Sequence, residues 1–192
     1  MSFGFPEEPC VNGRTLISNA IHHAIQNRDG QVLFFAAAAN DGGNQREMFP
    51  ARHDEVFSVR ATDHQGTFQD FNPPPNFWEA PVFGTLGKEV PGAWLNTQNY
   101  EVCKTGTSIA TPIAAGTAAT ILGYVQLGLS SNRFDNVTRM KKLWTKRGMY
   151  SAFMKLSRQM EEKCFYLYPQ DFLRETEEQG RDALLMDAAR IV

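Results

Sequence analysis

An uninterrupted apolar segment at residues 32–39 (VLFFAAAA) constrains the fold more than any other part of the sequence. Its side chains do not alternate between apolar and polar, so a strand here needs cover on both faces. Strands of this kind occur in parallel sheets that lie between two layers of helices. The segment ends at residues 40–44 (NDGGN), a cluster typical of turns and loops. The sequence therefore predicts an α/β fold built around this strand.

Further segments extend the α/β pattern on both sides of this strand. Residues 16–25 carry apolar side chains at helical spacing, and Asp29-Gly30 follows as a helix stop. Residues 108–127 are apolar on almost every face, which predicts a helix that is buried all round. Further strands are predicted at residues 1–5, 56–62 and 80–86.

The composition changes near residue 130. Residues 133–192 hold 12 of the 19 lysine and arginine residues, and they are predicted to form amphipathic helices broken near Pro169. We therefore divide the chain into a domain at residues 1–128 and a helical extension at residues 129–192. The net charge of −2 gives no general reason to expect a nucleic-acid or membrane partner.

The predicted sheet has an unprotected first edge. A strand that begins at residue 1 and lies beside a fully apolar strand would leave an exposed apolar edge, which native proteins usually avoid. The sheet is therefore expected to be the second part of a larger one.

The cysteines and the amino-terminal residues bear on compartment and cofactors. Cys10, Cys103 and Cys164 are far apart and show neither CxxC nor Cys/His spacing, so no disulfide framework, metal or cofactor is expected. The opening residues show no signal peptide, and no apolar run reaches eighteen residues, so no membrane span is expected. Together these features favour an intracellular, reducing compartment.

Ser108 lies in the heptapeptide GTSIATP (residues 106–112), where the apolar helix begins. The free N–H groups and the positive end of the dipole at a helix start favour an anion, such as a developing oxyanion. Gly106 lacks a Cβ atom and would let a substrate backbone approach closely. For an isolated Gly-Thr-Ser, a simple helix cap is the commoner explanation, so the assignment depends on the other motifs.

The heptapeptide resembles the nucleophile motif of the subtilisin-like serine proteases, or subtilases, which reads G-T-S-x-A-x-P. The opening MSFG resembles the substrate-binding edge strand of that family, N-M-S-x-G. Residues 34–44 resemble its A-A-x-G-N-x-G segment, and residues 49–63 (FPARHDEVFSVRATD) are similar to Y-P-A-x-x-x-x-V-I-x-V-x-A-x-D. The resemblance covers roughly residues 1–128. It implies the carboxyl-terminal half of a subtilisin-like three-layer sandwich, followed by the helical tail.

The resemblance also implies roles for individual residues. Ser108 would be the nucleophile that forms the acyl-enzyme, and the side-chain amide of Asn40 and the N–H of Ser108 would hold the oxyanion. Ala39 stands where the family usually has glycine, and its methyl group is expected to disfavour bulky aromatic residues before the scissile bond. The residues expected to contact a bound peptide are Ser2, Phe3, Gly4, Ala38, Ala39, Gly106 and Thr107.

The other two members of the catalytic triad have no counterpart in this sequence. Subtilases order the triad as Asp, His, Ser, and the family's D-x-G and H-G-T motifs are absent here. His22, His23 and His53 are weak candidates for the base. The pair Asp63-His64 is another weak candidate, because adjacent residues rarely orient one another as a triad requires. Cys103 is likewise a weak alternative nucleophile, because no base is identified for it.

Two functions remain open at this point. The first is a serine endopeptidase that hydrolyses peptide or protein substrates through an acyl-enzyme, with an upstream segment supplying Asp and His. General-base assistance is worth about 10²–10⁴-fold in rate, so the chain alone would be weakly active or inactive. The alternative is a non-catalytic pseudo-protease that binds peptides or partner proteins.

Overall fold

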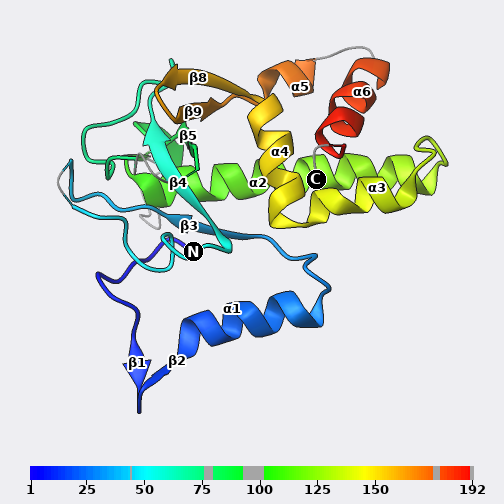
Figure 1. Cartoon of the computed structure of the whole chain (residues 1–192). Coiled ribbons are helices and arrows are strands. Elements are labelled where there is room, and N and C mark those ends of the chain that lie inside the picture. Colours follow the sequence, from blue (N-terminus) through cyan, green and yellow to red (C-terminus); the bar gives the residue numbers. More distant parts are fainter. Residues whose placement is uncertain (44, 76–79, 93–101, 175–177, 191–192) are drawn as a thin grey trace.

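A five-stranded sheet lies at the centre of the chain (Figure 1). The structure is a computed structural model that describes residues 1–43, 45–75, 80–92, 102–174 and 178–190. The strand order is β3-β4-β5-β9-β8; the first four strands are parallel, and β8 runs antiparallel to β9. The strands are β3 (Phe34–Ala37), β4 (Val56–Thr62), β5 (Val82–Leu86), β8 (Ser157–Glu161) and β9 (Cys164–Leu167).

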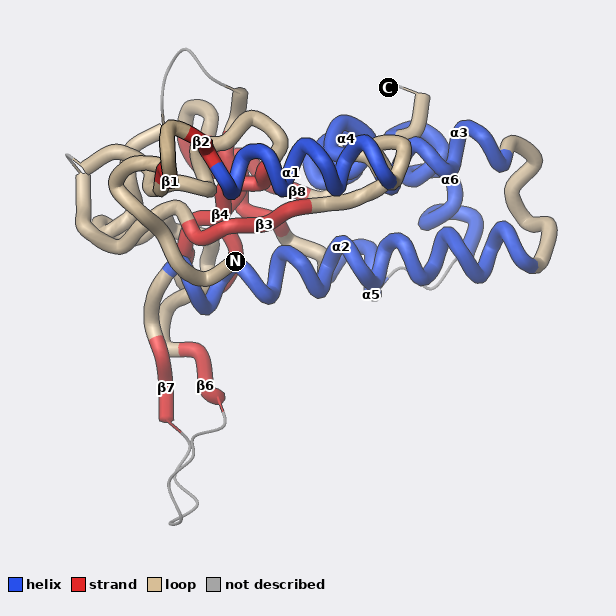
Figure 2. The backbone as a smooth tube through the Cα atoms, turned by 90° about the horizontal axis from the view of Figure 1, so that it is seen from below, coloured by secondary structure: helices blue, strands red, loops and turns tan. Residues whose placement is uncertain are grey.

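Helices cover both faces of β3, as its apolar sequence requires. Phe34 and Ala36 pack with Ile21 of α1 (Leu16–Asn27), whereas Phe35 belongs to the larger cluster on the side of α2 (Thr107–Ser130). Figure 2 shows β3 running between α1 and α2. The predicted α/β fold with a mostly parallel sheet between helices is confirmed.

The environment of the long helix α2 differs from the predicted one, in which the helix is buried all round. It packs on β3, β4 and β5, but only one side is buried, along Ala110, Ala114, Ile121 and Val125, whereas Leu127 is 65% exposed. By length and composition alone α2 is also apolar enough to cross a membrane, although it contains no run of eighteen apolar residues. Core helices of soluble proteins pass the same test, and α2 has a sheet beneath it.

The carboxyl-terminal segment is not wholly helical. The prediction of amphipathic helices over residues 133–192 is wrong for residues 157–167. These residues form the hairpin β8–β9, and β9 pairs in parallel with β5. The apolar sequence CFYL at residues 164–167 buries Cys164, Tyr166 and Leu167 and closes the edge that β5 would otherwise expose. The helices of this segment are α3 (Val137–Lys141), η1 (Lys142–Trp144), α4 (Lys146–Lys155), α5 (Gln170–Arg174) and α6 (Glu178–Ala188).

The predicted strand at residues 1–5 is reduced to backbone contacts at its two ends. The Met1 carbonyl accepts the N–H of Ala37, and Phe5 forms an isolated antiparallel bridge with Phe49. Two small hairpins were not predicted, and that of β6 and β7 projects from the body of the molecule (Figure 2). Their strands are β1 (Cys10–Val11), β2 (Arg14–Thr15), β6 (Val90–Gly92) and β7 (Val102–Lys104).

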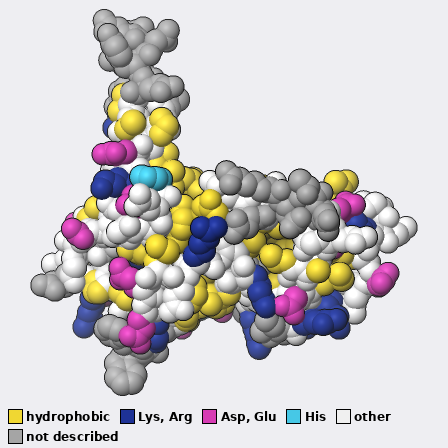
Figure 3. Space-filling view, turned by 90° about the horizontal axis from the view of Figure 1, so that it is seen from above, with side chains coloured by type: hydrophobic (Ala, Val, Ile, Leu, Met, Phe, Trp, Pro, Cys, Tyr) yellow, Lys and Arg dark blue, Asp and Glu magenta, His cyan; other side chains and the backbone are white. Residues whose placement is uncertain are grey.

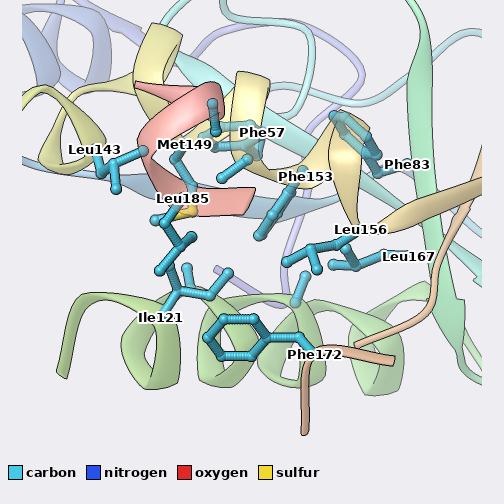
Figure 4. Packing of buried hydrophobic residues seen from close by; sticks show 14 of the residues in the cluster. Phe57, Phe83, Ile121, Leu143, Met149, Phe153, Leu156, Leu167, Phe172 and Leu185 are labelled. Carbon is cyan, nitrogen blue, oxygen red and sulfur yellow. The ribbon is translucent and has the colours of Figure 1, made fainter. Parts of the chain in front are cut away.

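One hydrophobic cluster joins the sheet to the carboxyl-terminal helices (Figure 4). The ring of Phe153 in α4 lies 5.5 Å from that of Phe57 and 5.4 Å from that of Phe83. The same cluster includes Ile121 of α2 and Leu185 of α6. Residues before and after position 128 therefore share a core, while the division of the chain into two domains at that point stays a prediction.

Charged side chains are spread over the surface. On the face shown in Figure 3, lysine and arginine side chains are interspersed with acidic ones.

A buried ion pair involves a residue of β4: Arg60, 1% exposed, lies 2.6 Å from the carboxylate of Glu47. The Nε–H group of Arg60 also donates to the carbonyl of Pro73, and an Nη2–H group donates to that of Pro74, so the buried guanidinium has polar partners besides Glu47.

Replacing Phe153 with alanine tests the shared core. Phe153 is 1% exposed, and its loss should reduce the free energy of unfolding by about 3–5 kcal/mol in a single cooperative transition. Urea denaturation, followed by circular dichroism, measures the effect. Leu127→Ala at an exposed position is the control and should change stability by less than about 0.5 kcal/mol. Two separate transitions, of which only one responds to Phe153→Ala, would contradict a common core.

A histidine pair should make the packing of α1 sensitive to pH. The rings of His22 in α1 and His53 lie 5.1 Å apart, and His53 Nδ1 accepts the N–H of Glu55. Burial, followed by the charge of His22, lowers the pKa of His53 below its usual value of 6.5, against the opposing effect of nearby carboxylates. The unfolded chain therefore binds the proton more readily than the folded chain.

Stability should consequently fall as the pH drops below 6.5 toward the folded pKa of His53. Urea unfolding of the wild type and of His53→Gln, between about pH 7.5 and pH 5.5, measures this loss. We expect a shallower pH dependence in the variant. His23→Gln, at an exposed position on the same helix, is the control and should keep the wild-type slope. Equal slopes for the wild type and His53→Gln would refute the assignment.

Candidate active site

Three segments meet where the parallel strands end. Asn40 follows β3, Gly87 follows β5, and Ser108 is the second residue of α2. In open α/β sheets the carboxyl ends of parallel strands lie at one edge, which is where ligands commonly bind. The fold therefore brings together the two residues predicted to be catalytic, although they are far apart in the sequence.

Asn40 is held by the first turn of α2. The N–H of Thr107 donates to Asn40 Oδ1 at 2.8 Å, so the carbonyl end of the amide is fixed and Nδ2 is its remaining donor. A Cβ atom at Gly106 would lie 3.3 Å from Asn40 Nδ2 and 3.4 Å from Ser108 Oγ. The amide and the serine hydroxyl therefore border the same small space beside Gly106. An oxyanion hole consists of hydrogen-bond donors that lie close to the nucleophile, as Asn40 Nδ2 lies close to Ser108 Oγ here.

Two glycines permit the tight approach of α2 to the sheet. Gly106 has φ of 149°, a region that other residues rarely adopt, and its N–H donates to the carbonyl of Gly87 at 2.8 Å. A Cβ atom on Gly87 would lie 2.7 Å from the Cβ of Ala61. Thr85 Oγ1 donates to the carbonyl of Ala110 at 2.9 Å and ties β5 to the helix. These contacts fix the position of the first turn.

The predicted peptide-binding residues border this site on one side. Ser2 Oγ donates to the Ser108 carbonyl at 3.1 Å, and Phe3 is 52% exposed beside it. Ala38 and Ala39 are buried, at 0% and 6% exposure. The structure thus places the amino-terminal residues next to the start of α2, while the binding roles stay predictions.

Met48 is a residue of this region that the sequence did not reveal. A Cβ atom on Gly4 would lie 2.6 Å from Met48 Cβ and 2.9 Å from its sulfur, so the Met48 side chain packs against Gly4. The Met48 N–H donates to the carbonyl of Ala38 at 2.9 Å. Met48 therefore links the two segments that are predicted to hold a peptide. Its place directly before the FPAR sequence is the signal that could have identified it.

The histidines do not complete the site. In the part of the chain that the structure describes, no hydrogen bond joins a histidine to Ser108 Oγ. His22 and His23 are exposed on α1, and His53 pairs with His22. Asp63 Oδ1 accepts the N–H groups of Gln65 and Thr67, each at 2.9 Å, and so stabilises a turn.

No metal centre accompanies the serine within the described ranges. There, no three or more His, Cys, Asp or Glu side chains are arranged to hold an ion. Cys103, the weak alternative nucleophile, is exposed on β7.

Comparisons with known proteins agree with this geometry. The chain is 32% identical over 115 residues to subtilisin-like protease 2 of Pseudogymnoascus destructans, covering 60% of this chain and 27% of the relative. It is 31% identical over 116 residues to the thermostable alkaline protease of Halalkalibacterium halodurans, covering 57% and 29%. The chain thus spans less than a third of the length of these two curated relatives.

Solved structures show the same fold. The S218A mutant of the PatA protease domain is 21% identical with a TM-score of 0.62, over 96% of this chain and 58% of that one. The PatG macrocyclase in complex with peptide is 20% identical with a TM-score of 0.57, over 98% and 50%. These similarities define the fold as that of a subtilisin-like protease domain.

The family follows from a match that covers most of the chain. The model of the Subtilase family matches residues 1–153. The chain therefore belongs to the Subtilase family, whose members are serine peptidases.

Two substitutions at Asn40 separate its structural role from its predicted chemical role. Asn40→Ala removes the acceptor of the Thr107 N–H and should cost about 0.5–1.5 kcal/mol of stability. Asn40→Asp keeps an oxygen acceptor and adds a negative charge at a helix start, so stability should be retained. Thermal and urea unfolding measure both. An equal loss for the two variants would show that Oδ1 does not anchor the helix.

Proposed function

We propose that Ser108 is the nucleophile of a serine endopeptidase that forms an acyl-enzyme with peptide substrates. The observation that carries the proposal is the shared space bordered by Ser108 Oγ and Asn40 Nδ2 beside Gly106. The Thr107 N–H fixes Asn40 by its oxygen, so the amide presents its N–H groups as donors. Backbone and side-chain donors fixed in advance stabilise a tetrahedral intermediate without reorganisation.

Catalysis by this serine requires a base that the described residues do not bring to it. A serine hydroxyl is a weak nucleophile until an adjacent base accepts its proton. We propose that an upstream segment of the catalytic domain supplies Asp and His. The partial coverage of the curated relatives supports this, because those proteins contain much additional sequence.

A second function, peptide or partner binding without cleavage, is favoured by the same missing base. The peptide-binding residues would remain useful without a triad, because strand-like pairing with a peptide needs only backbone groups. In either case a peptide is the proposed ligand.

The pocket for the residue before the scissile bond would include Ala39. We propose that the methyl group of Ala39 favours small side chains at that position of the substrate.

Labelling with a fluorophosphonate probe tests the state of Ser108. We expect the 192-residue chain to label about 10²–10⁴-fold more slowly than the thermostable alkaline protease, because the contribution of a general base is missing. Ser108→Ala should not label at all, whereas Ser131→Ala, at an exposed serine at the end of α2, should label like the wild type. Labelling that survives Ser108→Ala would show that another residue reacts.

The same probe distinguishes the two functions. A longer chain that includes D-x-G and H-G-T segments upstream should label rapidly if the protein is an endopeptidase. Peptide binding by such a chain, with no labelling of Ser108, would favour the pseudo-protease.

A further inference from the structure

A small pocket lies at the amino ends of β4 and β5, whereas Asn40 and Ser108 lie where the strands end. Val56 begins β4, Val82 begins β5, and both residues line the pocket. Further lining residues come from the loop before β4 and from α4. The pocket has a volume of about 240 Å³. Because a cavity of about 150 Å³ is enough to bind benzene, this pocket can hold a small molecule with one ring.

Lys146 brings an amino group to this pocket. It is the first residue of α4 and half-buried, and Tyr150 lines the same pocket one helical turn later. Lys146 Nζ donates to the carbonyl of Asp54, and it lies 6.0 Å from the centre of the Phe57 ring. The amine is therefore held beside an aromatic residue of the lining, whereas the ammonium group of an exposed lysine extends into water.

Burial makes this amine more nucleophilic than that of a lysine in water. It lowers the pKa of Lys146 below the ordinary value of 10.5, and the charges of Glu55 and Asp54 oppose this effect only in part. A larger fraction of the amine is therefore uncharged near neutral pH. Only the uncharged amine has a lone pair that can attack a carbonyl carbon.

The charged side chains around the pocket do not pair with this amine. Among the residues that the structure describes, no carboxylate forms an ion pair with Lys146. The carboxylate of Glu47 pairs with Arg60, and that of Glu7 pairs with Arg52. A carboxylate in contact with Nζ would hold the proton on the amine, so this arrangement allows Lys146 to lose it.

We propose that Lys146 binds small apolar aldehydes covalently in this pocket, as a Schiff base. The lone pair of Nζ attacks the carbonyl carbon and forms a C–N bond. The two protons of the amine pass to the former carbonyl oxygen, which leaves as water, and the C–N bond becomes a C=N bond. The step consumes no oxidant or reductant. The apolar part of the aldehyde lies against Phe57, Val82 and Phe83.

An anionic ligand fits this pocket less well than an uncharged aldehyde. The charges of Glu55 and Asp54 are close enough to affect the pKa of Lys146, and they would repel a carboxylate bound beside the amine. An uncharged carbonyl compound meets no such repulsion, and its apolar part is removed from water.

Reductive trapping on the 192-residue chain tests the proposal. The chain is incubated at neutral pH with benzaldehyde and sodium cyanoborohydride, which converts each Schiff base into a stable secondary amine. Mass spectrometry of the peptides then gives the labelling rate of each lysine. We expect Lys146 to label about tenfold faster than Lys141, an exposed lysine at the end of α3. Formaldehyde, which has no apolar part, should give a smaller ratio of the two rates.

Substitutions that fill the pocket separate its contribution from that of the amine. Ala80 is exposed and lines the pocket, so Ala80→Trp should reduce the benzaldehyde rate at Lys146 relative to the formaldehyde rate. Ala119→Trp is the matched control, because Ala119 is exposed on α2 and does not line the pocket. If Ala80→Trp prevents folding, as judged by circular dichroism, Val82→Phe replaces it, since Val82 is half-buried and lines the same pocket.

Two further variants define the reacting group. Lys146→Arg keeps the positive charge but has no amine that forms a Schiff base, so the fast site should disappear. Ser108→Ala should label at Lys146 like the wild type, because Ser108 does not line the pocket. The proposal therefore does not depend on the catalytic role of Ser108.

Three results would overturn the inference. The first is equal labelling of Lys146 and Lys141 by benzaldehyde. The second is the same ratio of these two rates with formaldehyde as with benzaldehyde, because a reactive amine would then act without a pocket for the aldehyde. The third is a folded Ala80→Trp or Val82→Phe variant that labels with benzaldehyde as fast as the wild type.

Discussion

The burial of β3 on both faces is the constraint on which the rest of the structure depends. A strand with phenylalanine and alanine on each side has to lie between two layers of helices, and α1 and α2 provide them. Parallel pairing with β4 and β5 then directs the ends of the strands to one edge. The first turn of α2 lies at that edge, so the position of Ser108 follows from the requirement to cover an apolar strand.

Local sequence patterns were sufficient for elements whose structure depends on their own residues. The strand β4 has the predicted bounds, 56–62, and β5 lies within the predicted residues 80–86. The hairpin of β8 and β9 was missed because β9 depends on a distant partner, the free edge of β5. The exposure of α2 was missed for a related reason: composition shows that a helix is apolar, not which of its sides pack against other elements.

The candidate site was predictable to a similar extent. The motifs around Asn40 and Ser108 located both residues, but not the bond by which the Thr107 N–H holds the amide oxygen. That bond gives one side chain two tasks, since its oxygen anchors the helix and its nitrogen remains available. Met48 could not be inferred, because its contact with Gly4 arises only when separate loops pack together.

The position of β9 has a consequence for where this fold can be divided. The family match ends at residue 153, before β9 and α6. Leu167 and Leu185, which lie beyond that point, are among the most buried side chains of the chain. A chain cut at residue 153 would leave the edge of β5 bare and open the core, and it would tend to aggregate through that edge. The limits of sequence similarity are therefore not the limits of the hydrophobic core, which extends into residues that family resemblance does not cover.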